Sequence, residues 1–173
     1  LFFQMVMIGL ILHVQENLGL SATGYGLVLA AGAVGGIAGG FLGERIVRRL
    51  GSGTAAQWML FASVPAFAGI ALAPNAWTLG LILALFEFCG LVWNTVSVST
   101  RQRMIPNHLL GRVNSIYRLL AWGMMPLGLL LSGLIVRGAE VVTGREAALT
   151  APFWTAALGV LIVTLVGWRH LGD

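Results

Sequence analysis

Residues 40–49 read Gly-Phe-Leu-Gly-Glu-Arg-Ile-Val-Arg-Arg, and this stretch decides the fold class. It places one acid and three arginines at the end of a glycine-rich apolar segment, directly before another apolar segment begins. Charged residues that interrupt long apolar runs mark the points where a chain leaves a lipid bilayer. The stretch therefore predicts a turn between two membrane helices, with its arginines at the anionic inner leaflet.

The composition of the whole chain points to the same solvent. Hydrophobic residues make up 58% of the sequence, charged residues only 9%, and the mean hydropathy is +0.90. A soluble domain carries roughly 25% charged residues to cover its surface, so lipid is the expected environment. The net charge of +4 does not indicate nucleic-acid binding, because the arginines stand in short clusters between apolar runs and form no continuous basic face.

Six apolar segments can be recognised outward from this turn. A spanning helix needs about 20 apolar residues, and backbone groups in hydrocarbon must pair within the segment, so the expected fold class is all-α transmembrane with six helices. The first segment is too short to cross the bilayer fully, which fits a lost upstream part. The segments are 1–14, 24–43, 54–73, 76–98, 113–136 and 151–168.

The distribution of arginine predicts the orientation of these segments. Eight arginines fall on one side of the predicted membrane, and only Arg137 and Arg145 fall on the other, accompanied by Glu140 and Glu146. Because arginine is enriched on the cytoplasmic side, we expect both ends of the chain to be cytoplasmic. The eight are Arg45, Arg48, Arg49, Arg101, Arg103, Arg112, Arg118 and Arg169.

Glycine recurs at spacings of three and four along the second segment. This period places the glycines on one face of a helix, where they allow a neighbouring backbone to approach closely. The face is either a static packing surface or a surface on which helices slide, and the sequence leaves both open. Its members are Gly32, Gly35, Gly36, Gly39, Gly40 and Gly43.

Glu87 lies at the centre of the segment 76–98, where an ionised carboxylate is costly. Gly80, Glu87, Asn94 and Arg101 recur every seven residues and therefore share one helix face, with a drift of only about 20° per step. We interpret this stripe as the wall of a substrate or proton path, in which Glu87 binds a proton or a cationic group. A neutral, hydrogen-bonded structural carboxyl is the alternative.

The fifth segment contains further candidates. Arg118 either extends its charge to the membrane surface or pairs with an acid inside the bundle. Pro126, between Gly123 and Gly128, is expected to loosen this helix, either for a gating bend or for packing.

His13 lies near the outer end of the first segment, where an interfacial position is favoured over a role as a proton relay. The chain has no metal-ligand spacing, no nucleophile–base pair and no phosphate-binding loop. We therefore expect no metal, no cofactor and no enzymatic activity.

Two stretches resemble a known family. The pattern Gly40-x-x-x-Glu44-Arg45-x-x-Arg48-Arg49 resembles the loop signature of the major facilitator superfamily, Gly-x-x-x-Asp-Arg-x-Gly-Arg-Arg, which recurs in weaker form in the second half of its members. Here a glutamate replaces the aspartate and Val47 replaces the inner glycine, as expected for a degenerate second copy. These residues would form the conformational loop motif of the family.

The second resemblance covers residues 100–133. The pieces Arg-Gln-Arg-x-x-Pro, Gly-Arg-Val-x-Ser-x-Tyr-Arg and Trp-Gly-x-x-Pro-Leu-Gly are similar to the superfamily branch of enterobactin-exporter-like and macrolide-efflux-like permeases. The match spans the whole chain, with residues 1–173 corresponding to helices seven to twelve. The resemblance thus implies the C-terminal half of a permease, whose N-terminal six-helix half is missing.

The resemblance implies a secondary transporter in a bacterial inner membrane. It would export a small organic compound, such as a drug, macrolide or siderophore, by using an ion gradient, usually of protons. Its partners would be the lipid bilayer, the substrate and the missing half, which Glu44 would contact. The alternatives are an importer or a lysolipid flippase of the same fold. From other classes, the membrane part of an ATP-driven exporter, a non-transporting scaffold and an intramembrane enzyme also remain.

Overall fold

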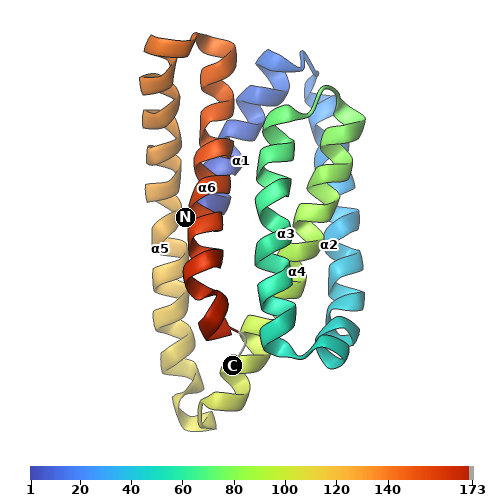
Figure 1. The fold of residues 1–173 in the computed structure, drawn as a ribbon, viewed down its shortest axis with the longest axis vertical. Helices are drawn as coiled ribbons and strands as arrows, with labels where there is room; N and C mark the ends of the chain where they lie inside the picture. Colours follow the sequence, from blue (N-terminus) through green and yellow to red (C-terminus); the bar gives the residue numbers. More distant parts are fainter. Residues whose placement is uncertain (172–173) are drawn as a thin grey trace.

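A computed structural model describes residues 1–171, with the side chains of 169–171 left out, and confirms the predicted all-α fold (Figure 1). A π-helical turn, η1 (His13–Asn17), continues the first helix. The side chain of Arg169, one of the arginines predicted to be cytoplasmic, lies outside the described residues. The helices are α1 (Phe2–Leu12), α2 (Ala22–Leu50), α3 (Ser52–Leu72), α4 (Ala76–Met104), α5 (Asn107–Thr143) and α6 (Arg145–Leu171).

Five of these helices, α2 to α6, are long and apolar enough to cross a membrane. Helix α1 has 11 residues and is not among them, in agreement with the short first segment predicted from the sequence. The chain is therefore a multi-pass membrane protein.

The connections are much shorter than the sequence suggested. The predicted connections 44–53, 99–112 and 137–150 are largely helical, because arginine and glutamate are good helix formers and continue a helix beyond its apolar part. Single glycines, Gly51 and Gly144, stand between α2 and α3 and between α5 and α6. Their φ angles of 82° and 81° lie in the region that favours glycine.

The helices pack in a consistent order (Figure 1). Helix α2 lies along α4, α3 contacts both α4 and α6, and α1 contacts both α5 and α6. In line with the orientation predicted from the arginines, we call the end of the bundle that contains η1 and Gly144 the outer end. The opposite end, which contains Gly51, is the inner end. The main apolar core joins α1, α3, α4 and α6 and includes Leu10, Ile70 and Phe153.

Four glycines of α2 are buried against α4, and we call this contact the glycine seam: Gly32, Gly35, Gly39 and Gly43. A Cβ atom on Gly35 would overlap the backbone of Ala84, and one on Gly39 would lie 2.6 Å from the Phe88 carbonyl oxygen. The backbones of α2 and α4 are therefore in direct contact along the seam. The other two glycines of the predicted face differ: Gly36 is half-buried beside Leu91 and Glu87, and Gly40 is exposed with nothing near it.

Candidate functional site

Glu87 lies midway along α4 and is half-buried against α2. A Cβ atom on Gly32 would lie 3.5 Å from the Cγ atom of Glu87. Among the described residues, no group forms a hydrogen bond or an ion pair with its carboxyl group. The side chain instead lines a cavity of about 230 Å³ together with Met7, Leu29, Gly32, Ala33 and Leu83. An unpaired carboxyl group thus faces an apolar cavity at mid-depth in the bundle.

The remaining members of the stripe have different surroundings. Gly80 lies against Ala31 of α2, whereas Asn94 is exposed. Arg101 is half-buried near the inner end of α4 and lies 14 residues from Glu87, which corresponds to about 21 Å along a helix. The stripe therefore shares a helix face but does not form one compact site within this chain.

Arg101 joins α4 to α5 at the inner end. Its Nη1 donates a hydrogen bond to Ser97 Oγ at 2.8 Å, and its guanidinium carbon lies 3.8 Å from the ring centroid of Tyr117 on α5. Such a cation–π contact is worth about 0.5–2 kcal/mol, depending on how far it is desolvated. The residue has a clear structural contact across the turn at Ile105 and Pro106.

Arg118 is exposed on α5, and its guanidinium carbon lies 5.8 Å from the ring centroid of Trp122. It pairs with no acid in the part of the chain that the structure describes. Of the two roles left open by the sequence, extension toward the membrane surface fits this exposed position.

The loop motif is located in the last turns of α2 rather than in a loop. Glu44 and Arg48 form an ion pair of 3.7 Å, with 78% and 67% of their side chains exposed. Arg45 and Arg49 are also exposed, near the C-terminal end of the helix, where positive charge is favourable. An exposed pair of this kind contributes little to stability, which leaves the carboxylate of Glu44 available for another contact.

The proposed kink residues of α5 also differ in their surroundings. A Cβ atom on Gly128 would lie 2.7 Å from the Leu1 carbonyl oxygen, so this glycine brings α1 close to α5. Gly123 has nothing within 4 Å. Pro126 is exposed, and α5 is a single helix on both sides of it.

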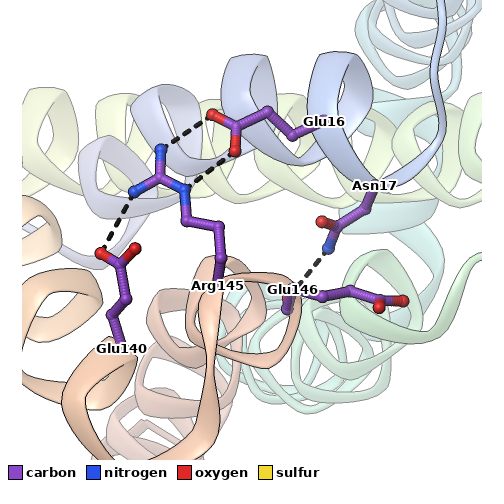
Figure 2. A network of polar contacts seen from close by, with 5 residues as sticks. All are labelled: Glu16, Asn17, Glu140, Arg145 and Glu146. Atoms are coloured by element: carbon purple, nitrogen blue, oxygen red, sulfur yellow. Dashed lines mark hydrogen bonds and ion pairs between the residues drawn. The ribbon is translucent and has the colours of Figure 1, made fainter.

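An ion-pair network at the outer end was not predicted in this form (Figure 2). Arg145 donates from Nε and Nη2 to the two carboxylate oxygens of Glu16, each at 2.8 Å, and from Nη1 to Glu140 at 3.3 Å. These contacts join η1, α5 and α6. The sequence placed Glu140 and Glu146 beside Arg145, but the two-oxygen partner is Glu16, which is 129 positions away, while the Glu146 side chain points away from it.

A second set of contacts joins η1 to α6. Asn17 Nδ2 lies 3.0 Å from both the Glu146 backbone oxygen and His13 Nδ1. His13 is only 3% exposed and meets the Phe153 ring edge-on, with 5.4 Å between the ring centroids. The ring is therefore enclosed by α6 and the end of α3 at the outer end of the bundle, and the interfacial position expected for His13 stays a prediction.

The outer ion pair predicts a pH-dependent stability. The hydrogen bonds from Arg145 hold the pKa of the Glu16 carboxyl below its ordinary value. Ionised Glu16 therefore stabilises the folded state above the ordinary carboxyl pKa of about 4, and this contribution is lost as the pH falls through the lowered value. The unfolding temperature of the unaltered protein in detergent should therefore decrease as the pH falls below about 4. We expect this decrease to be smaller in the Glu16→Gln variant.

The matched control for this experiment is Glu146→Gln. Glu146 lies at the same end of the bundle and forms no ion pair among the described residues. Its replacement should leave the decrease of the unfolding temperature at low pH the same as in the unaltered protein. Equal pH profiles for the Glu16→Gln variant and the unaltered protein would contradict the assignment.

No group of three or more His, Cys, Asp or Glu side chains that could hold a metal is found in the described part of the chain. The family described as transmembrane secretion effector matches residues 1–170 of the chain. No curated protein and no solved structure matches the chain significantly. The family match covers both stretches that resemble the major facilitator superfamily, residues 40–49 and 100–133.

Proposed function

Because the chain belongs to the transmembrane secretion effector family, which is of the major facilitator type, we propose that it is half of a secondary transporter that exports a small organic compound. Family membership points to a transporter rather than an enzyme. We propose further that a proton gradient drives export. The observation that carries this second proposal is the unpaired Glu87 carboxyl group beside an apolar cavity.

The chemistry of Glu87 suits reversible proton binding. An ionised carboxylate in a low-dielectric site without a partner is costly, so the group favours the protonated state while the cavity is closed. Access to water makes the charged state affordable and allows the proton to leave. A conformational change that exposes and covers Glu87 would thereby move a proton with each cycle.

The cavity beside Glu87 supports the presence of a second half. Its volume of about 230 Å³ is below the roughly 300–1,000 Å³ of pockets that enclose a drug-sized compound. We propose that a second six-helix half completes it, and that the exposed Gly40 and Gly123 allow helices of that half to approach closely. The exposed Glu44 would contact the same half, as the family resemblance implies.

The family description supports export as the proposed direction of transport. The printed description is of a secretion effector, which favours export over the importer and flippase alternatives. A drug, a macrolide or a siderophore is the proposed substrate, on the basis of the resemblance of residues 100–133.

Transport can be tested in inverted membrane vesicles that contain the full-length protein. After an acid interior has been established, addition of a macrolide or a catecholate siderophore should release protons, recorded by a fluorescent reporter of the gradient. The compound should accumulate inside the vesicles, and an ionophore that abolishes the gradient should prevent this. Accumulation that survives the ionophore and requires ATP would contradict the proposal.

A further inference from the structure

The hydrogen bonds around His13 determine which of its ring nitrogens carries a proton. The backbone oxygen of Glu146 can only accept, so the atom of Asn17 that faces it at 3.0 Å must be the amide nitrogen. The same nitrogen lies 3.0 Å from His13 Nδ1 and directs its second hydrogen there. Nδ1 is therefore an acceptor without a proton, and the neutral ring carries its hydrogen on Nε2.

The other nitrogen has no partner. His13 Nε2 is fully buried and closes no hydrogen bond within the described structure, although the Ile70 carbonyl of α3 lies near enough to interact with the ring. That carbonyl lacks its helical partner, because the residue four positions later is Pro74, which has no N–H group. The Ile70 carbonyl is therefore a free acceptor near the ring, but it forms no hydrogen bond with Nε2.

A cavity gives protons access to this ring from the outer end. It has a volume of about 540 Å³, and its lining includes His13, Asn17, Glu146 and Thr150. The charged groups nearest to it are Glu146 on α6 and the network of Glu16, Arg145 and Glu140 (Figure 2). The elements that pack on His13 therefore present three carboxyl groups and one arginine, while α3 contributes only backbone and apolar groups there.

We propose that His13 is a proton-binding site at the outer end of the bundle, and that proton uptake weakens the Asn17 contact between η1 and α6, while the Glu16–Arg145 ion pair continues to join the two elements. An imidazolium ring donates from both nitrogens, so Nδ1 can no longer accept from Asn17. If the amide turns its oxygen toward Nδ1–H, that oxygen replaces the donor to the Glu146 carbonyl, and two acceptors then face each other. If the amide keeps its orientation instead, its hydrogen bond to the Glu146 carbonyl remains, but the amide and Nδ1–H then face each other as two donors. The Asn17 contact is thus weakened in either arrangement.

This site is separate from Glu87 and independent of the compound exported. The rare π-helical turns are frequently found at functional sites, and η1 provides such a turn beside the Asn17 contact. Burial lowers the pKa of the His13 ring, so proton uptake there requires a lower pH than for an exposed histidine. Because Arg145 lowers the pKa of Glu16, the ion pair between them persists across the range in which histidines titrate, about pH 5–8. A change in the distance between η1 and α6 in that pH range can therefore be attributed to the Asn17 contact.

The change in the contact between η1 and α6 can be followed as the distance between two spin labels, measured by electron spin resonance. The labels are placed at Gln15 on η1 and Thr155 on α6, which are both exposed. The buried Cys89 is replaced by serine, and the full-length protein is frozen at a series of pH values between about 8 and 5. We expect the distance distribution to broaden as the pH falls, while the Glu16–Arg145 ion pair keeps η1 beside α6. The His108→Gln variant changes an exposed histidine elsewhere, and its distance distribution should depend on pH as that of the unaltered protein does.

Two variants separate the proposal from a general effect of acid. His13→Gln supplies an acceptor and a donor that do not titrate, so its distance distribution should stay narrow at every pH. Asn17→Asp removes the donor to the Glu146 carbonyl, so its distance distribution should already be broad at the upper end of the series. A titration that persists in His13→Gln would overturn the proposal. So would an Asn17→Asp distribution that matches the unaltered protein at high pH.

Discussion

Replacing Glu87 with glutamine is expected to reduce proton-coupled export to the level of membranes that lack the protein, while the amount of protein in the membrane is unchanged. Glutamine keeps the size of the side chain but cannot release a proton. Since no other group in the described structure bonds to the Glu87 carboxyl, no hydrogen-bond partner is left unpaired by the change. The variant therefore removes titration with little effect on packing.

The measurement is compound-dependent proton release in inverted vesicles, together with quantitation of the protein. Glu146→Gln serves as a control for the loss of a carboxylate at a site away from Glu87. Glu87→Asp retains a titratable group and should keep part of the activity. If Glu87 is instead a neutral structural carboxyl, the glutamine variant will transport as well as the unaltered protein, and the coupling role is then excluded.

Replacing Gly35 with alanine is expected to lower the free energy of unfolding by about 3 kcal/mol or more, at the upper end of the costs of overpacking. The added Cβ atom would overlap the carbonyl group and Cα atom of Ala84. A flexible side chain can move aside, whereas the backbone of a helix cannot do so alone. The α2–α4 contact must therefore widen, and the glycine seam loses close contacts along its length.

Gly26→Ala is the matched control for this prediction. Gly26 lies in the same helix, but nothing stands within 4 Å of the position of its Cβ atom. Because alanine is the better helix former by about 1 kcal/mol, this variant should be as stable as the unaltered protein or more so. Unfolding of both variants by denaturant in detergent, at matched lipid content, measures the difference. Equal stabilities would mean that the seam is not closely packed in the membrane.

The sequence predicted helix faces better than the contacts between helices. Glycine spacing in α2 predicted a face for close approach, since the period of a helix is a local property. It did not identify α4 as the neighbour, and it did not separate the buried Gly39 from the exposed Gly40. Those outcomes depend on how α2 is rotated against its neighbour, which residues distant in the sequence decide.

The outer network illustrates the same limit for polar residues. Charge counting correctly grouped Arg145 with Glu140, because five positions of sequence separate them. The stronger contact, with Glu16, arises only when η1 is placed beside the start of α6. A single sequence carries no signal for such a pair. The lengths of the connections were wrong for another reason: hydropathy marks where the lipid ends, whereas a helix ends where its backbone hydrogen bonding stops.

The links at Gly51 and Gly144 have a mechanical consequence. With one residue between two long helices, the joined ends cannot separate, and the backbone conformation of that residue, with φ 82° and ψ 157° at Gly51 and φ 81° and ψ 168° at Gly144, is accessible essentially only to glycine. A displacement of the inner end of α2 must therefore be followed by the inner end of α3, and the outer ends of α5 and α6 are coupled in the same way.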